Sequence, residues 1–475
     1  MRWKLVRTQI MIVIGAVLTA CYSIERDEID PGDPAAGWLS YFLLAQLFDS
    51  TASGCPVPTT STPGDVGSFQ KISATEGGFS GVLDDGDNFG HSTVALDLNG
   101  DCRLELAVGA NFDDDGGTDR GAVWILFLNA DGTVSSHQKI SSTQGNFTGS
   151  LDDQDEFGHA LGTTDLNNDG IPELLVSATK DDDGGSNRGA LYVLFMNTDG
   201  TVSSHQKISN TAGGFGGALD NDDEFGFGPT HIGDLDGNGI PEIAAGGLGD
   251  DGGPNRGELW VLFMNADGTV RNQQSISDTS GNFSGTLNDN DNFGLFNAGV
   301  GDLDGDGVRD LATAAYNDDD GGADSGAVWT LFLNANGTVK NHSKISSSMN
   351  NSGMVIDAGD LLGHGLIAPG DLNQDGVVDL IAGAPADADG GTGRGATWPV
   401  FLGRDGIAGG HGKISNLTGD FNATLADNDN FGSYNAYPGD LNGDGVPDLV
   451  SGARGDDDGG TDRGAVYVLF LQGMN

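Results

Sequence analysis

The sequence predicts an all-β fold, a six-bladed β-propeller of four-stranded antiparallel blades. Three observations predict it: a Phe-Gly dipeptide recurs at nearly constant spacing, each repeat holds four short strand-like segments, and the repeat region begins and ends in the middle of a unit. A seven-bladed propeller is the alternative within the same class. An open solenoid of the same units would leave two bare sheet edges.

The repeat is about 68 residues long. Phe-Gly steps of 68, 68, 68, 69 and 69 residues divide the region 69–475 into six units. Repeats that cannot bury their own apolar face stack on their neighbours, so the units should form a continuous core. The repeated dipeptide begins at Phe89, Phe157, Phe225, Phe293, Leu362 and Phe431.

Each unit reads as four strands separated by turns. In the first unit the strands are expected at 90–96, 104–110 and 122–128 and in the segment ending at Ser141. The third strand, AVWILFL in this unit, is apolar almost throughout and recurs in every unit. Such strands need cover on both faces, which radially stacked blades provide. Pro399 lies in the third strand of the fifth unit, removes one backbone donor and predicts an irregular blade.

The two ends of the repeat region predict how the ring closes. Residues 69–73 (FQKIS) match a fourth strand with no preceding three, and residues 464–471 match a third strand with no fourth. We therefore expect the first strand to complete the last blade.

Two segments precede the propeller. Residues 1–20 have a basic start and an apolar run too short to span a bilayer, which is typical of a signal peptide. Residues 18–21 (LTAC) resemble the lipobox of bacterial lipoproteins, which implies lipid attachment at Cys21; an ordinary signal peptide is the alternative. Residues 21–68 read as a linker with one short helix at 35–48. We expect an exported chain, lipid-anchored at the cell surface or outer membrane, or alternatively secreted.

A nine-residue acidic loop follows the first strand of each unit. In the last copy Asp440, Asn442, Asp444 and Asp448 occupy positions 1, 3, 5 and 9, and Val446 at position 7 can offer its carbonyl. Oxygen ligands at alternate positions of a tight loop suit Ca²⁺. Solvated turns are the alternative, but three carboxylates about 5 Å apart repel by roughly 3 kcal/mol per pair at an effective dielectric near 20.

We therefore expect about six Ca²⁺ ions, one per blade. The expected ligands in the other five copies are Asp97, Asn99, Asp101, Arg103, Glu105, Asp165, Asn167, Asp169, Ile171, Glu173, Asp234, Asp236, Asn238, Ile240, Glu242, Asp302, Asp304, Asp306, Val308, Asp310, Asp371, Asn373, Asp375, Val377 and Asp379. The net charge of −49 also favours cations or basic partners and argues against nucleic acid.

These features together resemble a known family. The repeat is similar to the FG-GAP repeat of integrin α-subunit propellers and related bacterial proteins. The similarity lies in Phe-Gly, the acidic loop, a small-residue turn such as Gly383-Ala384-Pro385 and a following Gly-Ala-Val-Tyr. The resemblance covers residues 69–475, about 85% of the chain. It implies a propeller with Ca²⁺ in the first interstrand loops. Integrin α propellers have seven blades, of which fewer bind metal, so integrin-type partners do not follow from it.

A second acidic cluster recurs on the opposite face, as in Asp113-Asp114-Asp115. One hypothesis is a second ring of cation sites. The other is that the arginines that close these loops neutralise them as structural pairs. These arginines are Arg120, Arg188, Arg256, Arg394 and Arg463.

Cys55 and Cys102 remain after Cys21, and export favours their pairing. Cys102 replaces the glycine at position 6 of the first acidic loop, and Cys55 lies 14 residues before Phe69. We predict a Cys55–Cys102 disulfide that holds the linker to the first blade.

The sequence favours a binding protein over an enzyme. Histidines recur in phase with the blades, which suits a structural role, and His231, the one out of phase, has no matched nucleophile. The leading interpretation is a monomeric, non-catalytic binding or adhesion module for an extracellular protein or glycan. The alternative is a lectin with sugar pockets lined by Trp124, Trp260, Trp329 and Trp398; core packing of these residues competes with it. The tripeptide Arg454-Gly455-Asp456 is interpreted as a coincidence of two repeat features.

Overall fold

The structure is a computed structural model that describes residues 63–249, 253–347 and 353–473. The expected signal peptide, linker helix, Cys21 and Cys55 lie outside these residues. Across the described part of the chain, no helix is long and apolar enough to cross a membrane.

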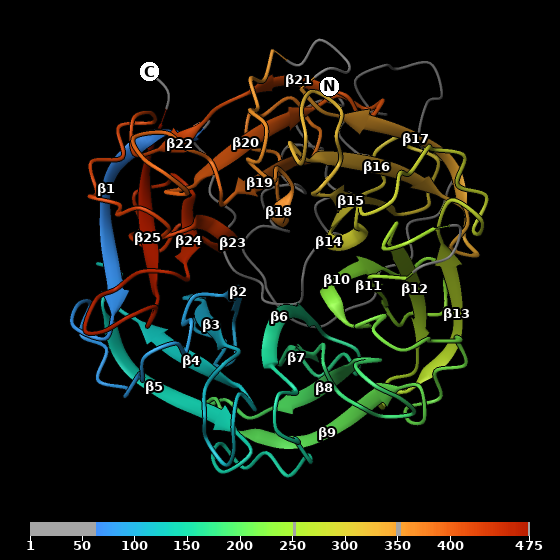
Figure 1. Ribbon diagram of the computed structural model, residues 1–475, viewed down its shortest axis with the longest axis horizontal. Helices are drawn as coiled ribbons and strands as arrows, with labels where there is room; N and C mark the ends of the chain where they lie inside the picture. Colours follow the sequence, from blue (N-terminus) through green and yellow to red (C-terminus); the bar gives the residue numbers. More distant parts are fainter. Residues whose placement is uncertain (1–62, 250–252, 348–352, 474–475) are drawn as a thin grey trace, which may run out of the picture. The chain divides into compact units, whose positions relative to one another are not determined.

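Six antiparallel sheets follow one another around a common centre, which confirms the six-bladed propeller (Figure 1). Blade 1 contains β2 (Ser92–Leu96), β3 (Glu105–Ala110), β4 (Ala122–Leu128) and β5 (Val134–Ser141); blade 2 contains β6 (Phe157–Thr164), β7 (Glu173–Ala178), β8 (Ala190–Met196) and β9 (Val202–Ser209). Blade 3 contains β10 (Phe227–Gly233), β11 (Glu242–Gly247), β12 (Glu258–Met264) and β13 (Val270–Ile276). Blade 4 contains β14 (Phe293–Gly301), β15 (Asp310–Ala315), β16 (Ala327–Leu333) and β17 (Val339–Ile345).

Blade 5 contains β18 (His364–Gly370), β19 (Asp379–Ala384), β20 (Ala396–Leu402), β21 (Ala408–His411) and β22 (Ile414–Ser415). Its fourth strand is interrupted, as expected from Pro399. Both β21 and β22 pair with β20, and the break lies at Gly412, whose N–H donates to the Pro399 carbonyl over 2.8 Å. Because Pro399 has no N–H to donate in return, the regular ladder cannot continue there.

Blade 6 is built from both ends of the described chain. It contains β23 (Phe431–Gly439), β24 (Asp448–Ala453), β25 (Ala465–Gly473) and β1 (Pro63–Ser73). β1 pairs antiparallel with β25, with Ile72 opposite Val466. The predicted ring closure is confirmed, and the closing strand begins at Pro63, earlier than the expected start at Phe69.

The Phe-Gly dipeptides join neighbouring blades. The N–H of Phe157, in blade 2, donates to the carbonyl of Arg120 in blade 1 over 2.9 Å. Its ring is fully buried. Gly121, the next residue of blade 1, has a φ of +82°, and a Cβ there would lie 2.1 Å from the Phe157 carbonyl oxygen. Only glycine therefore fits this contact.

The same joint closes the whole ring. Its N–H···O distances are 2.9 Å for Phe89 to Arg463, 2.8 Å for Phe225 to Arg188, 2.9 Å for Phe293 to Arg256, 3.0 Å for Leu362 to Ser325 and 3.0 Å for Phe431 to Arg394.

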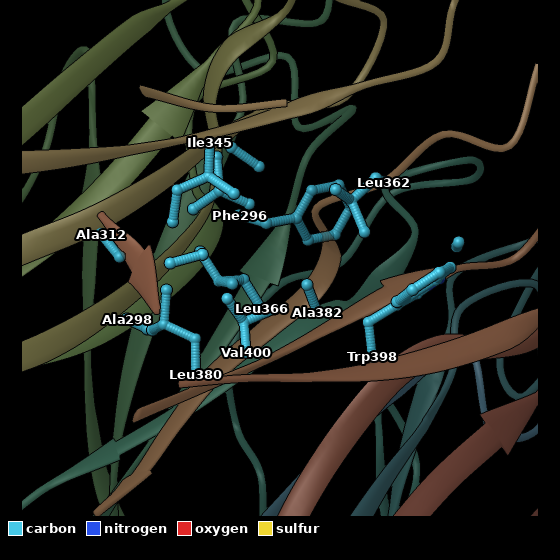
Figure 2. Close-up of a cluster of buried hydrophobic side chains, with 14 of the residues drawn as sticks. Phe296, Ala298, Ala312, Ile345, Leu362, Leu366, Leu380, Ala382, Trp398 and Val400 are labelled. Carbon is cyan, nitrogen blue, oxygen red and sulfur yellow. The ribbon is translucent and has the colours of Figure 1, made fainter. Parts of the chain in front are cut away.

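Side chains from adjacent sheets fill the space between blades. One cluster joins blades 4 and 5 and includes Phe296, Leu366, Leu380, Trp398 and Val400, all buried (Figure 2). The third strands are buried almost throughout, as β12 and β16 are at every position. Cover on both faces thus explains their continuous apolar sequences.

The closing strand yields a stability prediction. Ile72 in β1 is fully buried, so Ile72→Ala should lower the free energy of unfolding by about 2–5 kcal/mol through lost contacts and a cavity. Denaturant unfolding measures this loss. Ser68→Ala, at an exposed position of the same strand, is the control and should change little. Equal stability of both variants would contradict the role of β1 in the core.

Candidate metal centres in the first interstrand loops

The aspartate at position 1 organises each acidic loop. In blade 6, Asp440 Oδ1 accepts N–H groups from Gly443 over 2.8 Å and Asp444 over 3.0 Å. Its Oδ2 accepts the N–H of Gly445 over 2.7 Å. Gly445 stands at position 6 with a φ of +89°, as the sharp turn requires. One carboxylate therefore holds the backbone in a tight arc around itself.

The corresponding aspartates of the other blades make bonds of the same kind. The distances are 2.8 Å for Gly100 to Asp97, 3.1 Å for Gly170 to Asp165, 2.7 Å for Gly239 to Asp234, 2.8 Å for Gly307 to Asp302 and 2.8 Å for Gly376 to Asp371. In the first loop the residue at position 6 is Cys102, with a φ of +65°. Cys102 is disulfide-bonded. The predicted partner, Cys55, lies outside the described residues, so that pairing stays a prediction.

The acid at position 9 is the first residue of the second strand, and its side chain turns back under the loop. In every blade one of its carboxylate oxygens accepts the N–H of the leucine at position 2. The distances are 2.8 Å for Leu98 to Glu105, 2.6 Å for Leu166 to Glu173, 2.6 Å for Leu235 to Glu242, 2.9 Å for Leu303 to Asp310, 2.8 Å for Leu372 to Asp379 and 2.9 Å for Leu441 to Asp448.

Two of these buried carboxylates keep one oxygen without a hydrogen bond. Asp448 and Glu242 are fully buried, and neither Asp448 Oδ1 nor Glu242 Oε1 has a hydrogen-bond partner. A buried carboxylate oxygen without a partner is costly unless a cation or water meets it. The donor set of the loop therefore fits a hard cation bound by oxygen.

Burial and crowding also make these carboxylates unfavourable in their ionised form. Burial raises the pKa of Asp448 to about 7, and the nearby charges of Asp444 and Asp440 add to the effect. The pKa of Glu242 is likewise raised to about 7 by burial, with contributions from Asp236 and Asp234. A divalent cation would offset both causes, because it favours the ionised form.

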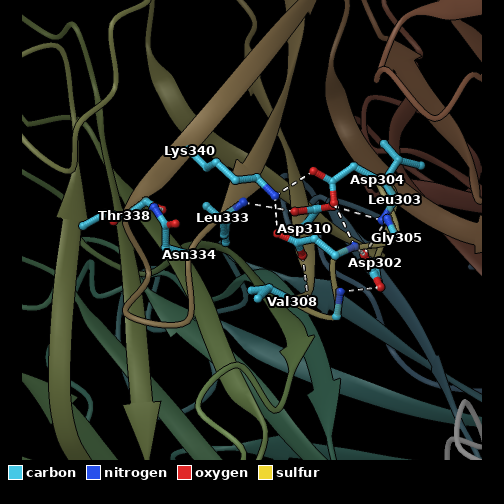
Figure 3. A network of polar contacts seen from close by, with 12 residues as sticks. Asp302, Leu303, Asp304, Gly305, Val308, Asp310, Leu333, Asn334, Thr338 and Lys340 are labelled. Atoms are coloured by element: carbon cyan, nitrogen blue, oxygen red, sulfur yellow. Dashed lines mark hydrogen bonds and ion pairs between the residues drawn. The ribbon is translucent and has the colours of Figure 1, made fainter.

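The carboxylates of blades 3 and 4 lie closest together. Asp234, Asp236 and Glu242 offer oxygens that all lie within 4.8 Å of one another. Asp302, Asp304 and Asp310 do the same in blade 4 (Figure 3). In these two blades the acids of positions 1, 3 and 9 therefore lie together, and their role as metal ligands stays a prediction.

Two of the loops also contact a basic side chain from the fourth strand. Arg271 Nη2 lies 2.7 Å from Asp236 Oδ2 and 3.7 Å from Glu242 Oε1. Lys340 Nζ lies 2.6 Å from Asp304 Oδ2 and also contacts Asp306 (Figure 3). Sequence reasoning missed both contacts, because these residues lie some 30 positions after their loops.

On the opposite face the second acidic loops contain lysines. Lys139 Nζ lies 2.7 Å from Asp113 Oδ2 and 2.9 Å from Asp115 Oδ2. The ammonium also lies over the ring of Trp124, 5.2 Å from its centre. The corresponding lysines of four other blades bridge their own aspartate pairs. These groups are Lys71 with Asp456 and Asp458, Lys207 with Asp181 and Asp183, Lys344 with Asp318 and Asp320, and Lys413 with Asp387 and Asp389.

The ion pairs of Arg120 and Arg463, two of the arginines that close these loops, differ from those in the second of the two hypotheses. Arg120 Nε contacts Asp153 of the following unit over 2.8 Å, so it bridges successive units. Arg463 contacts Asp85 over 2.8 Å in the same way. Blade 3 lacks the lysine bridge of the other five blades. Gly249 occupies the position of the first aspartate of the pair, and Ser275 occupies the position of the lysine. The aspartate and lysine are therefore present together or absent together.

The phased histidines near the Phe-Gly dipeptides belong to a belt of rings. The centres of the His91 and His159 rings are 4.5 Å apart, and His364 lies 4.1 Å from Phe296. His91 Nδ1 donates to the His159 carbonyl over 3.0 Å, which leaves Nε2 to accept an N–H of Arg454 over 3.1 Å. Burial lowers the pKa of His159 to about 3. Burial among other rings suits the structural role expected of these histidines, although His159 Nδ1 is buried without a hydrogen-bond partner.

Three further sequence features are placed by the structure. The four tryptophans are between 3% and 7% exposed and pack in the core. Asp456 is buried in its ion pair with Lys71, so the tripeptide that begins at Arg454 is not displayed as a free motif. His231 Nδ1 lies 3.1 Å from the hydroxyl of Thr164.

The fold and its loops define a six-unit β-propeller whose blades each carry one oxygen-rich loop. The FG-GAP repeat matches this chain at residues 89–126, 157–194, 296–331 and 434–469. The chain therefore contains FG-GAP repeats, and its propeller is integrin α-like. The third and fifth blades, which lack a match, are those that carry Gly249 and Leu362 in place of the repeated residues.

Two curated relatives support this assignment. Integrin alpha-3 of Cricetulus griseus is 30% identical over 203 residues, which span 42% of this chain and 17% of that protein. Integrin alpha-PS2 of Drosophila melanogaster is 25% identical over 245 residues, which span 50% of this chain and 16% of that protein. The chain thus spans about a sixth of the length of these relatives.

Solved structures align with the chain as well. The crystal structure of BBS1N in complex with ARL6DN, soaked with lead, aligns over 87% of this chain and 98% of that chain, with a TM-score of 0.37 and 10% identity. A likeness at this level does not establish a shared fold.

The lysine contacts yield a prediction about folding. Lys139→Met should lower the free energy of unfolding by about 3–5 kcal/mol, because it leaves the buried Asp113 carboxylate without its cation. The double variant D113G/K139S copies blade 3 and should recover part of that loss, which denaturant unfolding would measure. If Lys139→Met were neutral, the lysine would not be the structural counter-ion.

The buried aspartates that precede the Phe-Gly dipeptides predict a pH dependence. Burial raises the pKa of Asp155 to about 7, and the Asp181 carboxylate contributes. The folded state therefore binds this proton more tightly than the unfolded state, whose aspartate titrates near 4. The stabilisation that comes from the protonated Asp155 carboxyl is complete below about pH 4 and is lost as the pH rises to about 7.

In the presence of a chelator, the melting temperature should thus fall between pH 5 and pH 7.5. Asp155→Asn should flatten this slope in part, because the amide cannot ionise. A slope identical in the variant and the natural chain would contradict the assignment.

Proposed function

We propose that this chain is a calcium-binding propeller that is displayed outside the cell and binds an extracellular partner without catalysis. The observation that carries the proposal is the oxygen-rich loop present in all six blades, with its position 9 carboxylate buried under the loop. In blade 6, Asp448 Oδ1 is buried without a hydrogen-bond partner and belongs to this loop.

Calcium is the cation that the donor set favours. Positions 1, 3, 5 and 9 of the loops offer carboxylate and amide oxygens, and none of these positions has sulfur or imidazole. Hard cations with flexible coordination prefer such ligands, and Mg²⁺ demands stricter geometry and keeps more of its water. Asn442 and Asp444 complete the set around Asp440 and Asp448, and the Val446 carbonyl would supply position 7.

Display outside the cell is proposed from the N-terminal sequence. Residues 1–20 have the signature of a signal peptide, and Cys21 lies in a lipobox-like sequence. The binding role is supported by the likeness to integrin α propellers and by blade faces built from loops, which is where repeat proteins bind partners. We propose a protein as the partner.

A glycan is the second candidate partner, and one cavity favours it. A cavity of about 480 Å³ in blade 1 is lined by residues that include Ser80, Asp87, His137, Lys139 and Gln144. Its polar lining could bond sugar hydroxyls. Trp124 also lines the cavity but is only 4% exposed, so it offers little stacking surface. Binding to a glycan array, weakened by His137→Ala, would favour this candidate over a protein.

Calcium removal tests the proposal directly. The melting temperature of the protein should rise strongly with the concentration of free Ca²⁺. About six calcium ions should be bound per chain. A ligand at 100 times its Kd stabilises by about 2.7 kcal/mol per site. Asp448→Asn should remove one bound ion and the corresponding part of the shift.

Asp131→Asn is the matched control. It makes the same chemical change in an exposed turn, where blade 4 naturally has Asn336 with the same bond to the next threonine. This variant should keep the full calcium count. If the natural chain bound no calcium and its unfolding did not respond, the loops would be solvated turns and the proposal would fail.

A further inference from the structure

We infer that the six loops are not equivalent: in blades 3 and 4 the chain supplies a cation of its own, which competes with calcium. This inference rests on the proposed calcium sites and adds a difference in affinity among them. Arg271 and Lys340 are the competing residues.

The contacts place both side chains on the expected calcium ligands. Arg271 Nη2 is 2.7 Å from Asp236, at position 3 of its loop. Lys340 Nζ contacts Asp304 and Asp306, at positions 3 and 5. In the same blade 3 loop, the buried Glu242 Oε1 still has no hydrogen-bond partner. Arg271 Nη2 lies 3.7 Å from that oxygen, too far for a hydrogen bond. The basic side chain therefore occupies part of the donor set without replacing a bound ion.

The six copies show that this arrangement is built into two blades only. Arg271 and Lys340 lie in the bulge where the fourth strand shifts register against the third. The other blades have serine or glycine at the same place: Gly67, Ser135, Ser203 and Gly409. The same four blades have asparagine at position 3, whereas blades 3 and 4 have Asp236 and Asp304. The extra acid and the extra base thus occur together.

The electrostatics determine what this pairing does. A cation that contacts the ligands repels an incoming Ca²⁺, and it must leave before position 3 can bind the ion. The cost of leaving is modest, because Lys340 and Asp304 are both about 30% exposed and such ion pairs are weak. Calcium should therefore enter blades 3 and 4 at higher concentration, where Asp236 and Asp304 replace the asparagine that the other loops offer at position 3.

Equilibrium dialysis against graded free Ca²⁺, with bound calcium counted, tests the inference. The natural chain should bind four ions tightly and two about tenfold more weakly. The variant R271S/K340S, which copies the serine of blades 1 and 2, should bind all six in the tight class. Ser203→Lys should do the reverse and move the blade 2 site to the weak class, since Asp169 is within the same loop.

The control variant is R120S/R463S. It removes the same number of positive charges, but from ion pairs on the opposite face, so it should leave the two classes unchanged. Melting temperatures in chelator verify that each variant is folded.

The outcomes separate the two proposals. Six equivalent sites in the natural chain, unchanged in R271S/K340S, would overturn the inference and leave the proposed function intact. Loss of ions from R271S/K340S would also overturn it, because the basic side chains would then support binding. No bound calcium in any form would mean that the proposed function itself fails.

Discussion

The contact on which this propeller depends is the backbone joint between successive blades. A buried Phe-Gly, or Leu-Gly in blade 5, donates its N–H to a carbonyl just before the third strand of the preceding blade. A glycine with positive φ follows that carbonyl, so the two backbones approach more closely than any side chain would allow. The joint fixes the angle between sheets, and that angle places the first strands and their acidic loops at regular intervals.

The chain handles its large negative charge differently on the two faces. On one face lysines of the fourth strands bridge pairs of aspartates, so the counter-ion is covalently part of the fold. On the other face the fourth strands of four blades have serine or glycine at the place of Arg271 and Lys340. We propose that the loops of these blades are neutralised by a mobile ion instead. Blades 3 and 4 combine both solutions in one loop. Carboxylates that contact a lysine or arginine side chain are thus distinguished from carboxylates that remain available to a bound ion.

Much of this architecture followed from sequence. The spacing of Phe-Gly predicted the number of blades, and the half-units at each end predicted the closure, because both depend only on period and order. The positions of the acids in each loop were predictable because a loop of nine residues is a local motif, and their role as ligands stays a prediction. The counter-ions were not: Arg120 lies nearer in sequence to Asp113, but Lys139 reaches it across the sheet. Arg271 and Lys340 were missed because a bulge changes the direction of a side chain, and bulges have no simple sequence signal.

Because β1 pairs with β25, the last blade joins residues from opposite ends of the described chain. During synthesis, β1 leaves the ribosome among the first strands of the propeller and must wait for the last. Until then both β1 and the open side of blade 1 are unpaired edges, and contacts so distant in sequence are slow to form. During that period the high negative charge of the chain, which makes separate copies repel one another, disfavours their association.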